Sequence, residues 1–425
     1  LARLGIVQLA VSPDASAADQ NADLLRRVGA SAVVSDRQNQ DDPVHPLIAI
    51  DLETTLAGNG DPDPALRQDG GDRPLMFKSS SGTTGRPKLV GASHKGMIAS
   101  IVREQSAVGY LVDERYLTSV ALQFDAPKRR YLACIVSGST AVMPPATLSI
   151  EGMLDIFERH DIRHFSCVPR QAEDIALALP PGRQRLPNIR CLRLSAAPSD
   201  ARLLGLVRER ICSNIVLSYG CTELGPMTFA EPQVTTGISP SVGRPMPGID
   251  IEIVSADDRA VPAGNTGVVR VRAVGMPNRY LDDPEASARH FRNGWFYPGD
   301  LGTMSTDGEL TLMGRADDMM IFDGINIAPK EIELVLQAYP GVREVAAFPL
   351  RSRKSYQMPA AAVILEEGAD LDDLNRFART RLGSRAPILI ISVNDMPRNQ
   401  GGKIVKRVLS ELAEKHLEST SGRPL

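Results

Sequence analysis

One glycine-rich stretch, Lys78 to Val90, constrains the 425-residue chain more than any other. It carries, in order, Ser79, Ser80, Ser81, Gly82, Thr83, Thr84 and Gly85, and it ends in Arg86-Pro87-Lys88. Glycine allows positive φ angles and lets the backbone approach a ligand closely. Consecutive N–H groups in such a loop bind anions. Together with the hydroxyls and the Lys88 ammonium, they predict a cradle for phosphates.

The end of this stretch excludes an ordinary P-loop. In a P-loop, Gly-Lys is followed by Ser or Thr and by a helix. Here Gly85 is followed by Arg86 and Pro87, and proline disfavours a helical conformation at the residue before it. A flexible Ser/Gly linker is the alternative. The ordered Gly-x-x-Gly-x-Pro-Lys spacing between apolar runs at 75–77 and 89–90 argues against that alternative.

Composition excludes several classes of protein. With 43% hydrophobic and 23% charged residues, the chain is typical of globular proteins, and it is too long for one core of about 250–300 residues. Its net charge of -3 gives no reason to expect nucleic acid as a partner. No apolar run approaches the ~18–20 residues of a membrane span.

The cysteines indicate a compartment. There are five, scattered and without metal-ligand spacing: Cys134, Cys167, Cys191, Cys212 and Cys221. Such a pattern is typical of a reducing compartment. We therefore expect a cytoplasmic location.

The hydrophobic pattern predicts an α/β fold in two domains. Residues 1–75 alternate strand-like and helical segments, which indicates a parallel sheet covered by helices. Short alternating strands at 249–254 and 267–272 predict a β-rich subdomain. We expect a large domain over 1–314 and a small, mobile α+β domain over 315–425. Since the chain starts Leu1-Ala2 at a strand, without an initiator methionine, we expect the large domain to lack its N-terminal part.

Helical spacing predicts helices over 19–28, 93–108, 150–159 and 371–382, and one that starts at Pro329. In the 93–108 helix, the expected apolar face carries Met97, Ile98, Ile101 and Val102. The last helix is expected to carry Ile404 and Val405 among its apolar positions.

Four further motifs follow the cradle along the chain. They are Ser218-Tyr219-Gly220-Cys221-Thr222-Glu223, Gly294-Trp295-Phe296-Tyr297-Pro298-Gly299-Asp300, Gly314-Arg315-Ala316-Asp317-Asp318 and Pro397-Arg398-Asn399-Gln400-Gly401-Gly402-Lys403. With these motifs in this order, the chain resembles the adenylate-forming superfamily up to about Lys415. That superfamily comprises acyl- and aryl-CoA synthetases, peptide-synthetase adenylation domains and luciferases, all AMP-binding enzymes.

The resemblance implies an ATP site. Tyr219, beside Gly220, would offer a flat face to adenine, and Thr222 would offer a hydroxyl. Glu223 would help to hold Mg²⁺, a cation that prefers oxygen ligands. Asp300, on its Pro-Gly turn, would accept hydrogen bonds from ribose hydroxyls.

The resemblance also implies a catalytic role for the small domain. Arg315 would contact ribose and phosphate, and Lys403 would stabilise the charge that develops when a carboxylate attacks the α-phosphate. Asp317 would be the hinge between the adenylation and thioester steps. Gly324 would line the thiol tunnel. Ile321 departs from the family, because many relatives carry a lysine there, and this weakens a luciferase-like oxidation more than thioester formation.

The acyl substrate is the least constrained part. Asp125, in Phe124-Asp125-Ala126-Pro127, resembles the aspartate that binds the α-amino group in the amino-acid-adenylating branch; a turn or capping role is the alternative. Residues 128–130, Lys-Arg-Arg, would meet a second carboxylate or a CoA phosphate, but a solvated face is the favoured interpretation. His94, His160 and His164 lack a ligand set and are expected to be structural.

These features predict an ATP-dependent ligase that joins a carboxylic acid to a thiol through an acyl adenylate, with CoA as the acceptor. A standalone amino-acid adenylating enzyme that loads the phosphopantetheine of a carrier protein is the second interpretation, and Asp125 is its evidence. An inactive nucleotide-binding homologue is the third, and the presence of Glu223, Asp300 and Lys403 argues against it.

Overall fold

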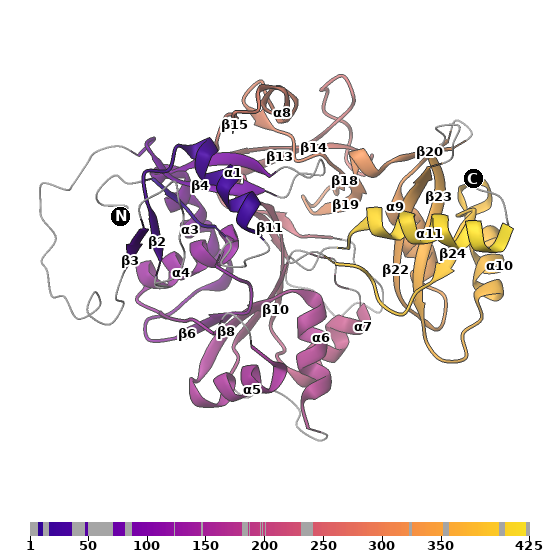
Figure 1. The fold of residues 1–425 in the computed structure, drawn as a ribbon, viewed down its shortest axis with the longest axis horizontal. Helices are drawn as coiled ribbons and strands as arrows, with labels where there is room; N and C mark the ends of the chain where they lie inside the picture. Colours follow the sequence, from indigo (N-terminus) through magenta and orange to yellow (C-terminus); the bar gives the residue numbers. More distant parts are fainter. Residues whose placement is uncertain are drawn as a thin grey trace, which may run out of the picture.

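The largest sheet in the described residues is built mainly from parallel strands that helices connect (Figure 1). The computed structural model describes residues 7–11, 17–35, 47–49, 71–80, 87–122, 124–145, 148–180, 186, 188–195, 197, 199, 201–230, 241–322, 325–351, 357–398 and 404–421. Within these residues the sheet has the order β12-β11-β10-β9-β8-β6-β7. The parallel strands are β6 (Arg115–Thr118), β7 (Thr140–Val142), β8 (Ile162–Cys167), β9 (Cys191–Ser195) and β10 (Ile215–Cys221).

The connections of this sheet follow from its topology. A parallel pair needs a crossover, which is usually a helix. The helices are α4 (Asp125–Ser137), α5 (Ile150–Arg159), α6 (Pro169–Ala178) and α7 (Ala201–Arg210). At one edge, β11 (Gly225–Ala230) and β12 (Arg244–Pro245) run antiparallel, so a tight turn suffices between β10 and β11. That turn carries Thr222 and Glu223.

A second sheet, in the order β1-β4-β5-β15, carries the phosphate cradle. Its strands are β1 (Gln8–Leu9), β4 (Pro74–Ser80), β5 (Lys88–Ser93) and β15 (Tyr280–Leu281). β1 and β4 are parallel, whereas β4 and β5 form an antiparallel hairpin. Helices α1 (Ala18–Val28) and α3 (His94–Val108) flank them, and β2 (Val33–Ser35) pairs in parallel with β3 (Leu47–Ala49).

The expected β-rich part is confirmed as an antiparallel sheet. Its strands are β13 (Ile249–Val254), β14 (Gly267–Ala273), β16 (Phe291–Arg292), β17 (Trp295–Phe296), β18 (Asp300–Met304) and β19 (Leu310–Arg315). Helix α8 (Pro284–His290) precedes β16. The motif around Asp300 therefore begins a strand, and the arginine of the next motif ends the neighbouring strand.

The C-terminal part is built on the sheet β22-β23-β24. Its elements are η4 (Ala316–Asp318), β20 (Met320–Phe322), β21 (Ile325–Ile327), α9 (Pro329–Gln337), β22 (Val342–Arg351), β23 (Gln357–Leu365), α10 (Leu371–Leu382), η5 (Gly383–Arg385), β24 (Leu389–Ser392) and α11 (Lys406–Ser421). Alternate residues of β23 face opposite sides of the sheet. Ala361 and Val363 pack with α9 and α10, while Ala360 and Ala362 pack with α11. In Figure 1 this part lies to one side of the rest of the chain.

The predicted fold class is confirmed, with two local corrections. On α3, Met97 and Ile101 are buried, but Ile98 and Val102 are 56% and 58% exposed. These two side chains lie about 100° around the helix from the buried pair. The predicted apolar face is therefore wider than the face that is buried. Helix α11 begins at Lys406, so Ile404 and Val405 precede it; Ile404 instead forms a bridge with Arg398.

No helix in the described ranges combines the length and the apolar character needed to cross a bilayer.

Candidate functional site

The phosphate cradle connects the two strands of a hairpin. Ser79 and Ser80 end β4 and pair with Leu89 and Lys88 of β5. The predicted ligands Ser81, Gly82, Thr83, Thr84 and Gly85 lie outside the described residues. Because a strand follows the loop instead of a helix, the prediction that this is not an ordinary P-loop is confirmed.

One arginine holds the end of the cradle. Arg27 of α1 donates a hydrogen bond to the carbonyl oxygen of Pro87 at 2.8 Å, and its Nε lies 2.7 Å from the Asp282 carboxylate. Through Arg27, Pro87 at the end of the loop is thus tied to the paired strands β5 and β15.

Lys88 and Glu223 meet at a tyrosine. The Lys88 Nζ lies 5.2 Å from the centre of the Tyr280 ring and 3.2 Å from His290 Nε2. The Tyr280 hydroxyl donates to Glu223 Oε1 at 2.7 Å. The structure therefore brings Lys88 of the cradle and Glu223 of the second motif to the same tyrosine. Sequence reasoning missed Tyr280 and His290, which no motif marked.

Tyr219, Asp300 and Arg315 also converge, although they come from three motifs. Tyr219 Oη donates to Asp300 Oδ2 at 2.5 Å, and Arg315 Nη1 donates to Asp300 Oδ1 at 3.2 Å. Burial and the Asp300 carboxylate hold the pKa of Tyr219 well above its usual value, so the phenol keeps its proton. A Cβ at Gly299, whose φ is +85°, would lie 2.7 Å from Arg315 Nη2, which explains the glycine.

This arrangement fits a nucleoside. Each Asp300 oxygen uses one lone pair for the bonds above, so a second lone pair on each can accept a ribose hydroxyl. Glu223 is a suitable oxygen ligand for Mg²⁺, but the described residues contain no group of three or more His, Cys, Asp or Glu side chains that could hold a metal alone. Nucleotide phosphates and water would have to complete the coordination sphere.

Gly220 and Thr222 shape the turn beside this site. A Cβ at Gly220 would lie 2.4 Å from the carbonyl oxygen of Gly225, so only glycine fits the irregular β10–β11 pairing. The carbonyl oxygen of Thr222 accepts a hydrogen bond from Lys78 Nζ at 3.3 Å.

Asp125 lies in a buried ion-pair cluster. It is the first residue of α4, and its carboxylate lies 3.2 Å from Lys78 Nζ and 2.5 Å from Arg129 Nη1. Burial alone would raise the pKa of Asp125, but Lys78 and Arg129 outweigh it and the pKa is lowered. Since two internal cations already neutralise the carboxylate, a substrate ammonium would have to compete with them. The role of Asp125 in substrate binding stays a prediction.

The solvated face favoured for residues 128–130 is wrong. Arg129 and Arg130 are 4% and 2% exposed, because the buried carboxylate of Glu104 on α3 faces them. Arg129 Nε lies 3.5 Å and Arg130 Nε 3.4 Å from Glu104, and Arg193 of β9 contacts the same carboxylate.

The predicted residues of the C-terminal part are only partly described. Asp317 lies in η4, directly after β19, with its carboxylate 3.6 Å from Arg315 Nη2. Its role as a hinge stays a prediction. Lys403 and Gly324 lie outside the described residues.

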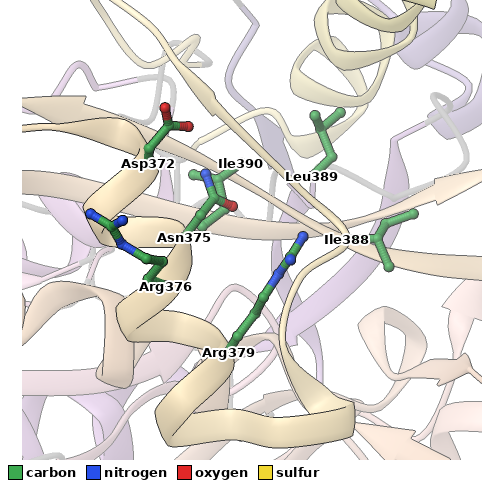
Figure 2. A pocket seen from close by; sticks show the side chains of 7 residues that line it. All are labelled: Asp372, Asn375, Arg376, Arg379, Ile388, Leu389 and Ile390. Carbon is green, nitrogen blue, oxygen red and sulfur yellow. The ribbon is translucent and has the colours of Figure 1, made fainter.

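Two hollows in the described parts of the chain bear on where the site lies. One is a small cavity lined by Lys78, Arg103, Glu223, Leu224, Ala92, Gly96 and residues 273–277, and it borders the candidate site. The other is a shallow pocket between α10 and β24, which side chains such as Asn375, Arg379 and Ile388 line (Figure 2). No predicted site residue lines the second pocket.

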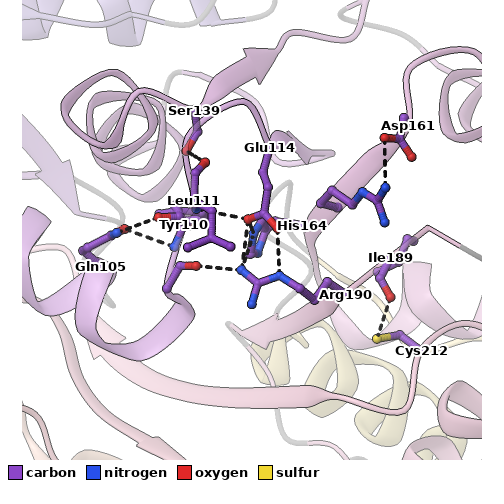
Figure 3. A network of polar contacts seen from close by, with 12 residues as sticks. Gln105, Tyr110, Leu111, Glu114, Ser139, Asp161, His164, Ile189, Arg190 and Cys212 are labelled. Carbon is purple, nitrogen blue, oxygen red and sulfur yellow. Dashed lines mark hydrogen bonds and ion pairs between the residues drawn. The ribbon is translucent and has the colours of Figure 1, made fainter.

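His164 has the structural role expected of it. Its Nε2 lies 2.6 Å from Glu114 Oε2, and Arg190 Nε lies 2.9 Å from Glu114 Oε1 (Figure 3). Arg190 also donates to the carbonyl oxygen of Gly109, so the network fastens the end of α3 to β8 and β9.

Two family models match this chain. Residues 1–281 match the family model described as AMP-binding enzyme, and residues 331–403 match the AMP-binding enzyme C-terminal domain. An indoleacetate–CoA ligase of Aromatoleum aromaticum is 30% identical over 85% of this chain and 72% of that protein. A 2-succinylbenzoate–CoA ligase of Bacillus velezensis is 27% identical over 86% of this chain and 74% of that protein.

The fold is also shared with a solved structure. The O-succinylbenzoate coenzyme A synthetase of Bacillus subtilis, in complex with ATP and magnesium ion, superposes with a TM-score of 0.76 at 22% identity. The match covers 92% of this chain and 81% of that chain.

Proposed function

Because the chain belongs to the AMP-binding enzyme family, we propose that it activates an organic acid with ATP and transfers the acyl group to coenzyme A. A carboxylate oxygen attacks the α-phosphorus of ATP, and pyrophosphate leaves. The CoA thiolate then attacks the acyl carbon, the bond from that carbon to the AMP oxygen breaks, and AMP leaves. Mg²⁺, when bound with ATP, neutralises phosphate charge.

The observation that carries this proposal is that Tyr219 and Arg315 both donate hydrogen bonds to the carboxylate of Asp300. These residues hold the nucleoside, with Asp300 as acceptor for the ribose hydroxyls. Lys88 and Glu223, which meet at Tyr280, lie at the phosphates and their metal ion. Lys403 stabilises the developing charge at phosphorus.

Two further points define the proposal. Relatives named for indoleacetate, 2-succinylbenzoate and 4-coumarate support an acid that bears a ring, with CoA instead of a carrier protein as acceptor. The engagement of Asp125 by Lys78 and Arg129 disfavours an amino acid as substrate. We also propose a cytoplasmic location, which five scattered cysteines that form no disulfide bond support.

The test is product analysis with a panel of acids. Purified protein is incubated with ATP, Mg²⁺, CoA and, in turn, indoleacetate, 2-succinylbenzoate, 4-coumarate or an amino acid. We expect AMP, pyrophosphate and an acyl-CoA with at least one ring-bearing acid. ADP and phosphate as products, or turnover of amino acids alone without need of CoA, would overturn the proposal.

A lysine variant tests the mechanism. Lys403→Ala should lower the rate of pyrophosphate release by about 10²–10³, the usual effect of losing one transition-state donor. Lys415→Ala, an exposed position on α11, is the matched control and should keep the wild-type rate. Pyrophosphate release near the wild-type rate from well-folded Lys403→Ala would contradict the assigned role.

A further inference from the structure

A cluster of buried cations lies beside the candidate site. We call Lys78, Arg103, Arg129, Arg130 and Arg193 the cationic cluster; each is at most 5% exposed. The side chains come from β4, α3, α4 and β9, so the fold itself gathers them.

The cluster carries more positive than negative charge. Within the described residues, two carboxylates contact it: Glu104, which faces Arg129, Arg130 and Arg193, and Asp125, which pairs with Lys78 and Arg129. Glu223 adds a third carboxylate on the wall of the cavity that Lys78 and Arg103 line, and three carboxylates cannot neutralise five cations. A buried charge without a partner is strongly unfavourable, so an excess of this size calls for another anion.

Several guanidinium nitrogens of the cluster are buried and have no acceptor within the described part of the chain. Arg103 uses Nη2 for the carbonyl oxygen of Leu224 at 2.9 Å, which leaves Nε and Nη1 unpaired. Arg130 uses Nη2 for Ser195 Oγ at 3.4 Å, and its Nη1 is unpaired. Native proteins rarely leave buried donors in this state unless a ligand or water satisfies them.

The cluster is continuous with the nucleotide residues. Lys78 and Arg103 line the small cavity whose wall also includes Glu223, and Lys78 bonds the carbonyl oxygen of Thr222. Ser195, which Arg130 contacts, lies beside Ser218 in the parallel register of β9 and β10. The carboxyl ends of parallel strands are where such sheets bind ligands. Arg103 therefore lies at the cavity that Glu223 also lines, and Arg130 lies at the carboxyl end of β9.

We propose that the acid substrate carries a second anionic group, a distal carboxylate, and that Arg103 and Arg130 bind it. This inference rests on the proposed function. A carboxylate supplies both the missing charge and acceptors for paired guanidinium donors, which match its planar geometry. Burial lowers the pKa of Arg103 and of Arg193 to about 10, as expected for cations whose charge is poorly compensated.

The test compares acids that differ only in the second carboxylate. One pair is 2-succinylbenzoate and 4-oxo-4-phenylbutanoate, which lacks the ring carboxylate; another is glutarate and its monomethyl ester. For the wild-type protein we measure kcat/KM for pyrophosphate release and, by calorimetry, Kd for each acid. We expect the dicarboxylate to be favoured by about 10²-fold or more in at least one pair, because the analogue leaves buried donors unpaired.

Two variants assign the preference to the cluster. Arg103→Met and Arg130→Met keep an unbranched side chain but remove the charge, and each should reduce the dicarboxylate preference at least about 10-fold. Arg190→Met removes a guanidinium from the Glu114 network, outside the cluster, and should leave the preference unchanged. A ratio of two acids on one protein sample is insensitive to the fraction of protein that is folded.

The outcomes separate the inference from the proposed function. If monocarboxylic acids yield acyl-CoA as efficiently as their dicarboxylate partners, the second-anion inference is overturned and the function stands. If dicarboxylates bind in calorimetry and Arg103→Met abolishes that binding, but no acid releases pyrophosphate, the inference stands and the function is overturned. Absence of both binding and turnover overturns both.

Discussion

At the residue scale, Asp300 is the point on which the proposed nucleoside ligands Tyr219 and Arg315 converge. Its two oxygens accept from Tyr219, which comes from the main sheet, and from Arg315, its cross-strand partner in the β-rich sheet. The carboxylate thereby fixes both neighbours while keeping lone pairs for a ligand. A single side chain thus couples two sheets to one function.

Asp300→Asn should raise KM for ATP about 10- to 100-fold while leaving the fold intact. The amide keeps the shape of the side chain, but it loses the charge that holds Arg315 and one acceptor for ribose; hydrogen bonds to charged groups are worth about 1.5–3 kcal/mol. Steady-state kinetics with varied ATP measures the effect. Asp307→Asn, at an exposed position of the same β18–β19 hairpin, is the control. An unchanged KM would exclude Asp300 from nucleotide binding.

Glu114 and its partner His164 make the stability of the fold depend on pH. Burial alone would raise the pKa of Glu114, but hydrogen bonds from His164 and Arg190 outweigh it, and the pKa lies below its usual value. Burial lowers the pKa of His164, against the opposing effect of Glu114. Both groups therefore bind protons more readily in the unfolded chain, so acid destabilises the fold.

The stability should fall in two ranges as pH decreases. The His164 contribution is complete above its unfolded pKa of about 6.5 and is lost below it, and the Glu114 contribution is complete above about 4.3 and is lost as pH falls through its lowered pKa. Glu114→Gln should lower the free energy of unfolding by about 1–3 kcal/mol near neutral pH, and by less near about pH 3.5. Denaturant titrations at several pH values measure this.

Glu285→Gln is the control, because its exposed pair with Arg289 contributes little. A Glu114→Gln penalty that stays constant down to about pH 3.5 would show that the charge of Glu114 is irrelevant.

At the scale of elements, helix α3 is placed by a contact between glycines. A Cβ at Gly96 would lie 2.3 Å from the carbonyl oxygen of Gly275, in the loop after β14. Ser93 caps the same turn, accepting from the Gly96 N–H at 3.1 Å. This close approach packs the start of α3, which carries Arg103 and Glu104 further along, against the β-rich part.

Gly96→Ala should therefore lower the free energy of unfolding by about 1–3 kcal/mol, as overpacking does, although alanine is the better helix former. Gly205→Ala on α7 is the matched control, because no atom lies within 4 Å of the added Cβ. It should raise stability by up to about 1 kcal/mol. Urea unfolding of both variants measures the contrast. Stabilisation by Gly96→Ala would contradict the packing described for α3.

At the scale of the whole molecule, a surface ion pair joins the large N-terminal part to the small C-terminal part. Arg170 of α6 lies 3.5 Å from Asp395, which follows β24, and both side chains are exposed. The boundary between residues 314 and 315 and the hinge at Asp317 stay predictions. An exposed ion pair contributes little to stability, so this contact is compatible with the rotation that the two-step reaction requires.

Local rules predicted much of this molecule. Pro329 starts α9 because its fixed φ suits a first helical turn, and Pro87 correctly excluded a helix after the cradle. The family resemblance, drawn from ordered motifs, is confirmed by the AMP-binding enzyme match.

The misses come from tertiary contacts that a sequence does not display. Arg129 and Arg130 look like a solvated charge run because nothing adjacent in sequence shows that Glu104, one helix earlier, faces them. Tyr280 and His290 belong to no motif, and they reach Lys88 and Glu223 only through the pairing of β15 with β5 and the packing of α8 behind it.

The most direct test of the proposed reaction follows an oxygen atom. An acid that the protein activates is labelled with ¹⁸O in its carboxylate, converted with ATP and CoA, and the nucleotide product is analysed by mass spectrometry. Because the carboxylate oxygen attacks phosphorus and the thiolate later breaks the acyl carbon–oxygen bond, the account predicts AMP with one heavy oxygen and unlabelled pyrophosphate. Unlabelled AMP, or ADP with label in the released phosphate, would contradict it.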